Sequence, residues 1–363
     1  MARRSHPGAG RAVMRLGRRA FCGGLAATAL AGPTPGATLQ ADARFDAVVG
    51  SGRGDHPTVA AALAAAPANE QRFRILLSEG RWEEKVTVSR PNVTIAGAGT
   101  FKTILRAAIA SGHRKPGGGT WGTYGSATLT VEAAGFHLSD LMVENGFDYL
   151  ANLRTRGVAD AQAVALALGN QADRTLIERV VLIGHQDTFY LRAGRALVRD
   201  SLIMGSIDFI FGGAAARFET CDIRSRHRPG ESLQGYVAAP STHRDQHAGL
   251  VFDRCQLKRE RGVPDASVYL GRPWRAGGNT ALRGAAAYLD CWMDAHIHPE
   301  GWTSMGYRLP DGTQMRFEPG DARFGERGSL GPGARPGSTR PQHSAEQAGA
   351  FSRHAMFGDW RPS

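Results

Sequence analysis

The sequence predicts an all-β protein whose chain winds into a parallel β-helix, with a short helix near the N-terminus and an extended tail at the C-terminus. From about residue 73, short runs alternate apolar and polar residues, and each run ends in a turn. The middle of the chain repeats itself at intervals of roughly 20 residues. The 47 glycines and the aromatic content of 8% also favour many short strands and turns over a helix bundle.

The repeat is clearest along one column of residues in the middle of the chain. Its successive members are 39, 21, 20, 34 and 36 residues apart. A short period that expands irregularly is typical of a solenoid in which some coils carry looped excursions, and stacked coils share a core that no coil could bury alone. An antiparallel β-sandwich also has regular short strands, but it does not explain the column. The column contains Leu141, Val180, Ser201, Cys221, Cys255 and Cys291.

These patterns divide the chain into residues 1–43, a β-helix over residues 44–326 and a tail over residues 327–363. The alanine-rich residues 59–66 are expected to form a short helix that covers the exposed edge at the N-terminal end of the β-helix. The tail is rich in Gly, Pro, Arg, Ser and His, as in an extended segment that wraps the surface. Within the tail, residues 344–351 are expected to form a short helix.

The first 43 residues have the features of an export signal, although an arginine-rich disordered leader is the alternative. Residues 17–21 read Gly-Arg-Arg-Ala-Phe, similar to the twin-arginine pattern, and a weakly apolar run follows. Ala41, Asp42 and Ala43 have the form of a cleavage site. No later stretch reaches the roughly 18 consecutive apolar residues that span a membrane. We therefore expect an exported, periplasmic or extracellular protein with no membrane partner.

The formal net charge is +11, but six arginines and no acid precede Asp42, so a chain that begins there carries +5. A basic surface attracts polyanions over long distances. Nucleic acid and an acidic polysaccharide both fit this charge. No motif supports nucleic acid, which we therefore do not expect as a partner.

Two aspartates, Asp187 and Asp208, lie 21 residues apart, which is the length of one short coil. They should occupy adjacent strands and face the same way, only a few ångströms apart. Paired carboxyl groups at such range have split pKa values, so one ionises while the other keeps its proton. Asp208 lies in an apolar strand and needs a partner, which Arg272 can provide. A single Asp in a turn is usually a solvated cap, but this pair with an arginine indicates ester hydrolysis by a nucleophile and an acid.

Here the sequence resembles the pectin methylesterases, over roughly residues 45–362. The matching segments occur in the family's order, and the one departure is Trp82 in place of a tyrosine. The resemblance implies a right-handed parallel β-helix, methylated polygalacturonate as substrate, no cofactor, no metal and a monomeric enzyme. The segments are residues 80–84, 125–128, 162–165, 186–188, 208–212, 270–274, 296–302, 331–334 and 359–362.

The resemblance also assigns catalytic roles. Asp208 is expected to attack the ester carbonyl, and Asp187 to protonate the departing methoxide and then activate water. Gln186 is expected to donate to the oxyanion, which typically contributes a factor of about 10² to 10³. Gln162 should assist Gln186 and contact the substrate. Arg272 should keep Asp208 ionised and oriented.

Three further residues are expected to contact the substrate. Trp274 offers a flat face for a sugar ring, and Thr128 corresponds to a substrate contact in the family. Glu84 should help Trp82 to shape the N-terminal end of the cleft. His296 and His298 alternate on one strand and so face opposite ways, which argues against a shared metal.

Other functions remain as alternatives on the same fold. A pectate lyase would need a calcium-binding acid cluster, which the sequence lacks near Asp208. A polygalacturonase would need a wider carboxylate pair and no oxyanion glutamine. A relative that hydrolyses acyl thioesters or another ester is a second alternative, and a non-catalytic polysaccharide-binding solenoid is a third.

The cysteines of the column pose a separate question. Export favours a disulfide between Cys221 and Cys255. Residues stacked on parallel strands point the same way, however, so their Cβ atoms should stay about 4.8 Å apart, whereas a disulfide needs about 3.5–4.5 Å. We therefore predict free thiols in the core, with Cys291 buried beside them.

Overall fold

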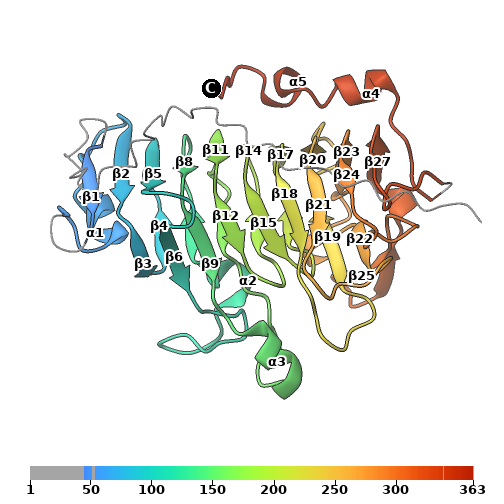
Figure 1. Cartoon of the computed structure of the whole chain (residues 1–363), viewed down its shortest axis with the longest axis horizontal. Coiled ribbons are helices and arrows are strands. Elements are labelled where there is room, and N and C mark those ends of the chain that lie inside the picture. Colours follow the sequence, from blue (N-terminus) through green and yellow to red (C-terminus); the bar gives the residue numbers. More distant parts are fainter. Residues whose placement is uncertain (1–44, 51–53, 338, 363) are drawn as a thin grey trace, which may run out of the picture. The chain divides into compact units, whose positions relative to one another are not determined.

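The computed structural model describes residues 45–50, 54–337 and 339–362. Over these residues the chain forms the right-handed parallel β-helix that the sequence predicts (Figure 1). Three long parallel sheets form its walls, and one antiparallel hairpin projects from it. The predicted export signal and leader, residues 1–43, lie outside the described residues.

Each complete coil contributes one strand to each sheet in turn. The first sheet contains β1 (Ala47–Val49), β2 (Phe73–Leu77), β5 (Val93–Gly97), β8 (His137–Ser139), β11 (Thr175–Glu178), β14 (Arg195–Arg199), β17 (Ala215–Glu219), β20 (Leu250–Asp253), β23 (Ala285–Leu289) and β27 (Arg323–Arg327). The second contains β3 (Gly80–Glu83), β6 (Thr103–Ala107), β9 (Met142–Asn145), β12 (Val181–Ile183), β15 (Leu202–Gly205), β18 (Asp222–Ser225), β21 (Gln256–Arg259) and β24 (Trp292–Met293). The third contains β4 (Val86–Val88), β7 (Leu129–Val131), β10 (Leu166–Leu168), β13 (Phe189–Leu191), β16 (Ile210–Gly212), β19 (Gly235–Pro240) and β22 (Val268–Gly271).

The remaining elements lie outside these walls. The hairpin pairs β25 (Met305–Arg308) with β26 (Gln314–Phe317). Two short 3₁₀ helices are η1 (Ala276–Gly278) and η2 (Pro319–Asp321). The α-helices are α1 (Val59–Ala64), α2 (Gly122–Gly125), α3 (Tyr149–Thr155), α4 (Ala345–Gly349) and α5 (Arg353–Phe357). No helix of the described residues is long and apolar enough to cross a membrane.

The repeat column predicted from the sequence lies at the turn from the first sheet to the second. Strand pairing places its six members in register on successive coils. The residue before each member has a left-handed backbone, with φ between 49° and 60°, so one residue turns the chain in every coil. Asp and Asn adopt this conformation more readily than most other residues, which suits the three aspartates among the six. The six are Asp140, Arg179, Asp200, Thr220, Arg254 and Asp290.

The interior is a continuous apolar core. Phe218, Phe252 and Tyr288 are register partners on neighbouring strands of the first sheet, and their rings stack with centroids 4.8 and 4.4 Å apart. Cys221, Cys255 and Cys291 are buried free thiols of the same core. Burial on this scale holds the coils together, because one coil cannot bury its inner face alone.

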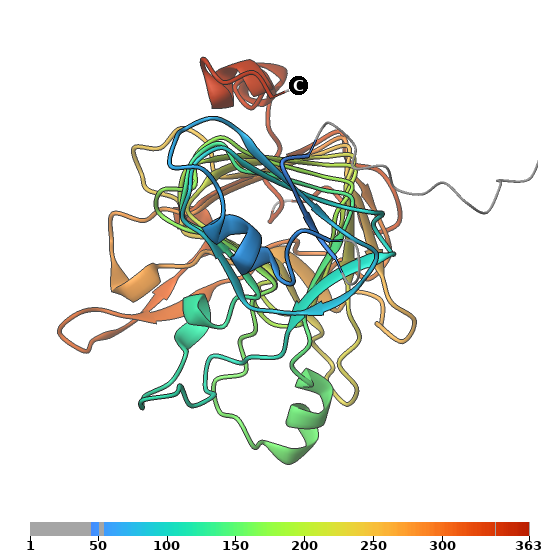
Figure 2. The same ribbon diagram turned by 90° about the vertical axis from the view of Figure 1, so that its left-hand side faces the viewer.

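Segments outside the coils cover the N-terminal opening and one outer face of the β-helix. At the N-terminal end, α1 begins at the cap Thr58, buries Val59 and Ala62, and lies across the opening of the coils in Figure 2. At the other end the tail turns back over the outer face of the first sheet (Figure 1). The helix expected within residues 344–351 is α4, and it begins with a capping box formed by Ser344 and Gln347.

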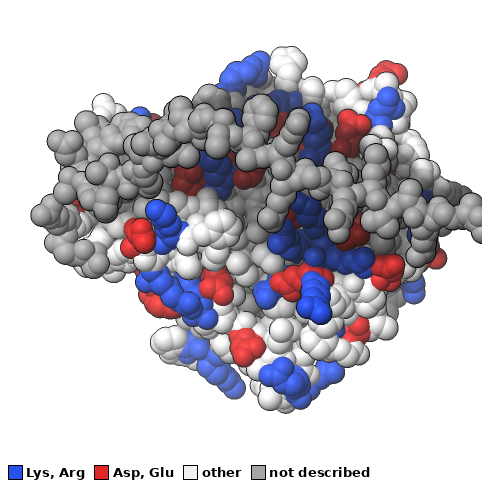
Figure 3. Space-filling view, in the orientation of Figure 1, with Lys and Arg blue, Asp and Glu red and all other residues white. Residues whose placement is uncertain are grey.

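Basic and acidic side chains are mixed on one face. In Figure 3 they lie beside one another at several places. Ion pairs on the second sheet include Arg106 with Glu144 at 3.1 Å and Arg224 with Asp222 at 2.7 Å.

Candidate active site

Asp187 and Asp208 occupy equivalent positions at the start of β13 and β16. Because Phe189 pairs with Ile210, the two aspartates stack on adjacent coils, as their spacing predicted. Both have a left-handed backbone, with φ of 64° and 48°, and the Asp187 amide donates to the carbonyl of Ile207 at 3.0 Å. Both side chains line one pocket of about 410 Å³ on the outside of the third sheet.

The environments of the two carboxyl groups differ. Burial, together with the nearby charge of Asp208, raises the pKa of Asp187 well above its usual range. Asp208 instead accepts two hydrogen bonds from Arg272, from Nε at 2.8 Å and Nη2 at 2.6 Å. Such a bidentate contact compensates a carboxylate strongly. The two stacked carboxyl groups therefore differ: that of Asp187 is buried and has a raised pKa, whereas that of Asp208 is paired with Arg272.

Arg272 is held from its other side by an aromatic ring. Its guanidinium carbon lies 3.8 Å from the ring centroid of Tyr236, which continues the column of the two aspartates on the next coil. Tyr236 stacks on Tyr269, and Tyr269 stacks on His298 at 4.2 Å. The charge of Asp208 raises the pKa of Arg272 although burial opposes that shift. Sequence reasoning missed Tyr236, although counting along the strand register from Asp208 reaches it.

Two side-chain amides face the same pocket. Gln186 and Gln162 both line it, and the backbone amide of Ala163 donates to the carbonyl of Gln186 at 3.1 Å. The Oε1 atom of Gln162 is buried and has no partner among the described residues. An unpaired buried amide oxygen is costly unless water or a ligand meets it. Both amides can therefore bind a molecule in the pocket.

Aromatic rings form the floor of the pocket. Tyr190 stacks on Phe211 at 4.3 Å, and Trp274 meets Phe211 at 5.8 Å. Tyr124 of α2 packs edge-on against Tyr190 at 5.8 Å. Tyr190 and Phe211 are register partners that point outward from the third sheet. Strand alternation alone could have revealed Tyr190, because it lies between two buried residues.

Two expected substrate contacts lie elsewhere. Thr128 is fully buried and its hydroxyl donates to the carbonyl of Glu144 at 2.9 Å. Glu84 accepts hydrogen bonds from the amides of Val59 and Ala60 at 2.9 and 2.8 Å. It thereby pairs free N–H groups in the first turn of α1. The structure does not support substrate contact by either residue, and both stabilise the β-helix instead.

Arg192 and Met305 also line the pocket, and sequence reasoning missed both. Arg192 follows β13 directly and is exposed. Met305 comes from the hairpin, more than 90 residues after Asp208, so no local signal placed it there. No group of three or more His, Cys, Asp or Glu within the described ranges could hold a metal ion.

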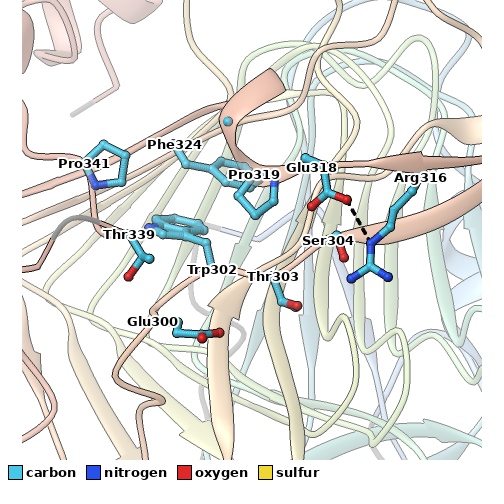
Figure 4. Close-up of a pocket in the computed structure, with 11 residues that line it drawn as sticks. Glu300, Trp302, Thr303, Ser304, Arg316, Glu318, Pro319, Phe324, Thr339 and Pro341 are labelled. Atoms are coloured by element: carbon cyan, nitrogen blue, oxygen red, sulfur yellow. Dashed lines mark ion pairs between the residues drawn. The ribbon is translucent and has the colours of Figure 1, made fainter.

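A second hollow of about 490 Å³ is lined by residues of the segment before the hairpin, of β26 and of the tail (Figure 4). Its walls include the stacked rings of Trp302 and Phe324, and Arg316 pairs with Glu318 there at 2.9 Å. Its lining residues contain no stacked pair of carboxyl groups with a buried arginine partner. The pocket of Asp187 and Asp208 is therefore the candidate active site.

Comparison with known proteins shows the family to which the chain belongs. The pectinesterase family model matches residues 46–318. Pectinesterase A of Dickeya chrysanthemi is 36% identical over 345 residues, which cover 89% of this chain and 93% of that protein.

Solved structures give the same result. A pectin methylesterase in complex with a hexasaccharide superposes with a TM-score of 0.85 at 36% identity, covering 88% of this chain and 98% of that one. The pectin methylesterase of Yersinia enterocolitica superposes with a TM-score of 0.80 at 36% identity, covering 84% of this chain and 99% of that one. The chain thus belongs to the pectinesterase family and is a carboxylic ester hydrolase.

Proposed function

We propose that the enzyme hydrolyses the methyl esters of polygalacturonate to free carboxylates and methanol. One observation carries this proposal: Asp187, whose pKa is raised, stacks in one pocket beside Asp208, which is paired with Arg272. A relative of similar fold was solved with a bound hexasaccharide, which supports a saccharide chain as ligand. The aromatic floor supports the same class of ligand, because flat rings pack against the apolar faces of sugars.

In the first step Asp208 is the nucleophile. A carboxylate oxygen of Asp208 attacks the ester carbonyl carbon, and the electron pair of the C=O bond moves to the oxygen. As the tetrahedral intermediate collapses, the bond to methoxide breaks and Asp187 supplies the proton that makes methanol. The galacturonate acyl group is then joined to Asp208 as an anhydride.

In the second step Asp187 acts as a base. It now lacks its proton, so it can take one from a water molecule as that water attacks the acyl carbon. The bond to Asp208 breaks, and the new galacturonic acid group leaves and releases its remaining proton to solvent as it becomes a carboxylate. Asp187 is protonated again and Asp208 is ionised again, so the cycle is complete.

The amides of Gln186 and Gln162 are proposed to donate to the oxyanion of both intermediates. Such donors act mainly when charge develops on the oxygen, and one of them typically contributes about 10²- to 10³-fold. Trp274 is proposed to support a sugar ring beside Phe211. Arg272 keeps Asp208 oriented toward the acyl carbon.

The test is methanol release from highly methylated pectin. Asp208→Asn is nearly isosteric but removes the nucleophilic charge, so turnover should fall by roughly a thousandfold or more while the protein still folds. Asp187→Asn should also be severely impaired, because methoxide is a poor leaving group without a proton donor. The control is Asp245→Asn, on a residue whose side chain is 79% exposed.

Near-normal turnover by Asp208→Asn would sink the mechanism. Wild-type enzyme that cleaves a short nitrophenyl ester but releases no methanol from pectin would favour the alternative of another ester substrate. We further propose that residues 1–43 direct export, which would bring the enzyme to a polysaccharide outside the cytoplasm. Deletion of these residues should keep the enzyme inside the cell.

A further inference from the structure

A cavity of about 330 Å³ lies between the tail and the outer face of the first sheet, on a different wall from the active site. Strand register places Ala287 beside Val251 and Ala285 beside Arg323, and all four residues line the cavity. Further along the same face, the ring of Phe357 packs against the sheet. Over the two alanines the small side chains leave the space beneath the tail open.

Three rings form one side of this cavity. Phe351, which follows α4, lies 5.2 Å from the ring of His343 and 6.2 Å from that of His247, between ring centroids. His247 Nε2 donates to the carbonyl of Ala350 at 2.9 Å, so the ring is fixed to the tail. Aromatic rings pack favourably against the edge or the offset face of another ring. The cavity therefore suits a ligand that contains a flat apolar ring.

Arg323 gives the cavity a positive charge without an acid to balance it. None of the described residues that line the cavity is Asp or Glu, and Arg323 makes no ion pair with any described residue. Its Nη1 and Nη2 atoms donate to the carbonyls of Gln246 and His243 at 2.6 and 3.0 Å, whereas its buried Nε has no partner in the described part of the chain. Burial and the nearby Arg283 lower the pKa of Arg323. An anion in the cavity would compensate this charge.

We propose that this cavity binds a small aromatic carboxylate, whose ring lies among the rings of Phe351, His343 and His247 and whose carboxylate meets Arg323. The volume is near the lower end of the roughly 300–1,000 Å³ of ligand pockets, so it suits a molecule with one ring rather than a saccharide chain. A purely apolar molecule would leave the arginine unpaired, and a sugar acid would place hydroxyl groups against the two alanines. The site is separate from the ester hydrolysis on the third sheet. Because its ligand contacts both the sheet and the tail, binding also stabilises the docked tail.

The experiment titrates the enzyme with benzoate and with its uncharged analogue benzamide, followed by nuclear magnetic resonance of the ligand. Benzoate should bind with a Kd of about 1 mM or tighter, as a ligand of so few atoms can. Arg323→Gln should weaken benzoate binding by about tenfold or more and leave benzamide binding unchanged, because only benzoate makes a charge-assisted contact. The control is Arg74→Gln, which removes the same charge from an exposed position on the first sheet and should bind benzoate as the wild type does.

Ala285→Phe tests the location of the site, because it places a ring in the cavity beside Arg323. Benzoate binding should be lost in this variant, while methanol release from pectin stays at the wild-type rate. A second readout is trypsin cleavage at Arg353 in the tail. Benzoate at ten times its Kd should slow this cleavage about tenfold in the wild type, since it binds only the docked tail, and should not slow it in Ala285→Phe.

Three results would overturn the proposal: no benzoate binding by the wild type, equal losses of benzoate and benzamide in Arg323→Gln, or unchanged benzoate binding by Ala285→Phe. The last result, together with competitive inhibition of methanol release by benzoate, would place the ligand in the active site instead. Thermal unfolding of each variant within a few degrees of the wild type shows that a loss reflects binding. Should Arg323→Gln fail to fold, Arg323→Lys, which keeps the charge, must bind benzoate more tightly than benzamide.

Discussion

The raised pKa of Asp187 makes the stability of the fold depend on pH. Its pKa is raised by burial and by the charge of Asp208, so the folded protein binds this proton more tightly than the unfolded chain does. Below about pH 4, Asp187 is protonated in both the folded and the unfolded state, and the free energy of unfolding is not reduced by its titration. As the pH rises above that value, the unfolded chain releases the proton first, and stability is lost until the pH passes the folded pKa.

Asp187→Asn should therefore be more stable than the wild type at neutral pH although it is nearly inactive. The amide has the size of the acid but does not ionise. Near pH 4 the two unfolding temperatures should agree, and by pH 7 the variant should unfold a few degrees higher, since 1 kcal/mol shifts Tm by about 2–4 °C in a protein of this size. Calorimetry across this range measures the difference. A difference that is constant with pH would show that the proton on Asp187 does not matter for stability.

The sequence predicted the relative positions of residues that are separated by one coil without a loop. The 21-residue spacing was enough to stack Asp187 on Asp208, because no loop intervenes between these coils. Glu84 could not be placed in the same way, since its partners are the free amides of a helix 24 and 25 residues earlier. Arg192 carries no motif, and its contact with the ring of Tyr124 depends on where α2 lies.

At the scale of elements, strands of only three to five residues have little structure of their own and are specified by their neighbours. The repeat column predicted the register correctly because each coil turns at one left-handed residue and then buries the next. The excursions were harder to predict. Helix α3 arises in a long interval of the column, between Leu141 and Val180, and no periodicity in the sequence revealed it.

The three cysteines of the column, at the turn from the first sheet to the second, are predicted to be free thiols. Each sulfur contacts the carbonyl oxygen two residues earlier, at 3.3, 3.6 and 3.4 Å for Cys221, Cys255 and Cys291. Burial raises the pKa of Cys221 and Cys291, so these thiols should be inert in the folded enzyme. Titration of the denatured, unreduced protein without its leader should find three thiols. A count of one would mean that two of them are joined.

At the scale of the whole β-helix, the tail connects coils that do not otherwise touch. Coils of a solenoid contact only their neighbours. The tail, however, leaves from β27 and returns along the first sheet, where Arg217 of β17 donates to the carbonyl of Phe351 and Arg195 of β14 donates to that of Phe357. Arg353 also pairs with Glu219. The contacts of Arg195, Arg217 and Arg353 bridge 134 to 162 residues of sequence, so the tail acts as a clamp along the stack.

The clamp depends on apolar contact as well as on charge. Phe357 is fully buried against Leu197, Val251 and Leu289 of the first sheet. Phe357→Ala should destabilise docking by about 3–5 kcal/mol, as for a large buried side chain elsewhere. Trypsin should then cleave faster at Arg353, while methanol release is unchanged because the active site lies on the third sheet. Phe101→Ala is the control, since Phe101 is 72% exposed. If both variants were cleaved at the wild-type rate, ion pairs rather than Phe357 would hold the tail in place.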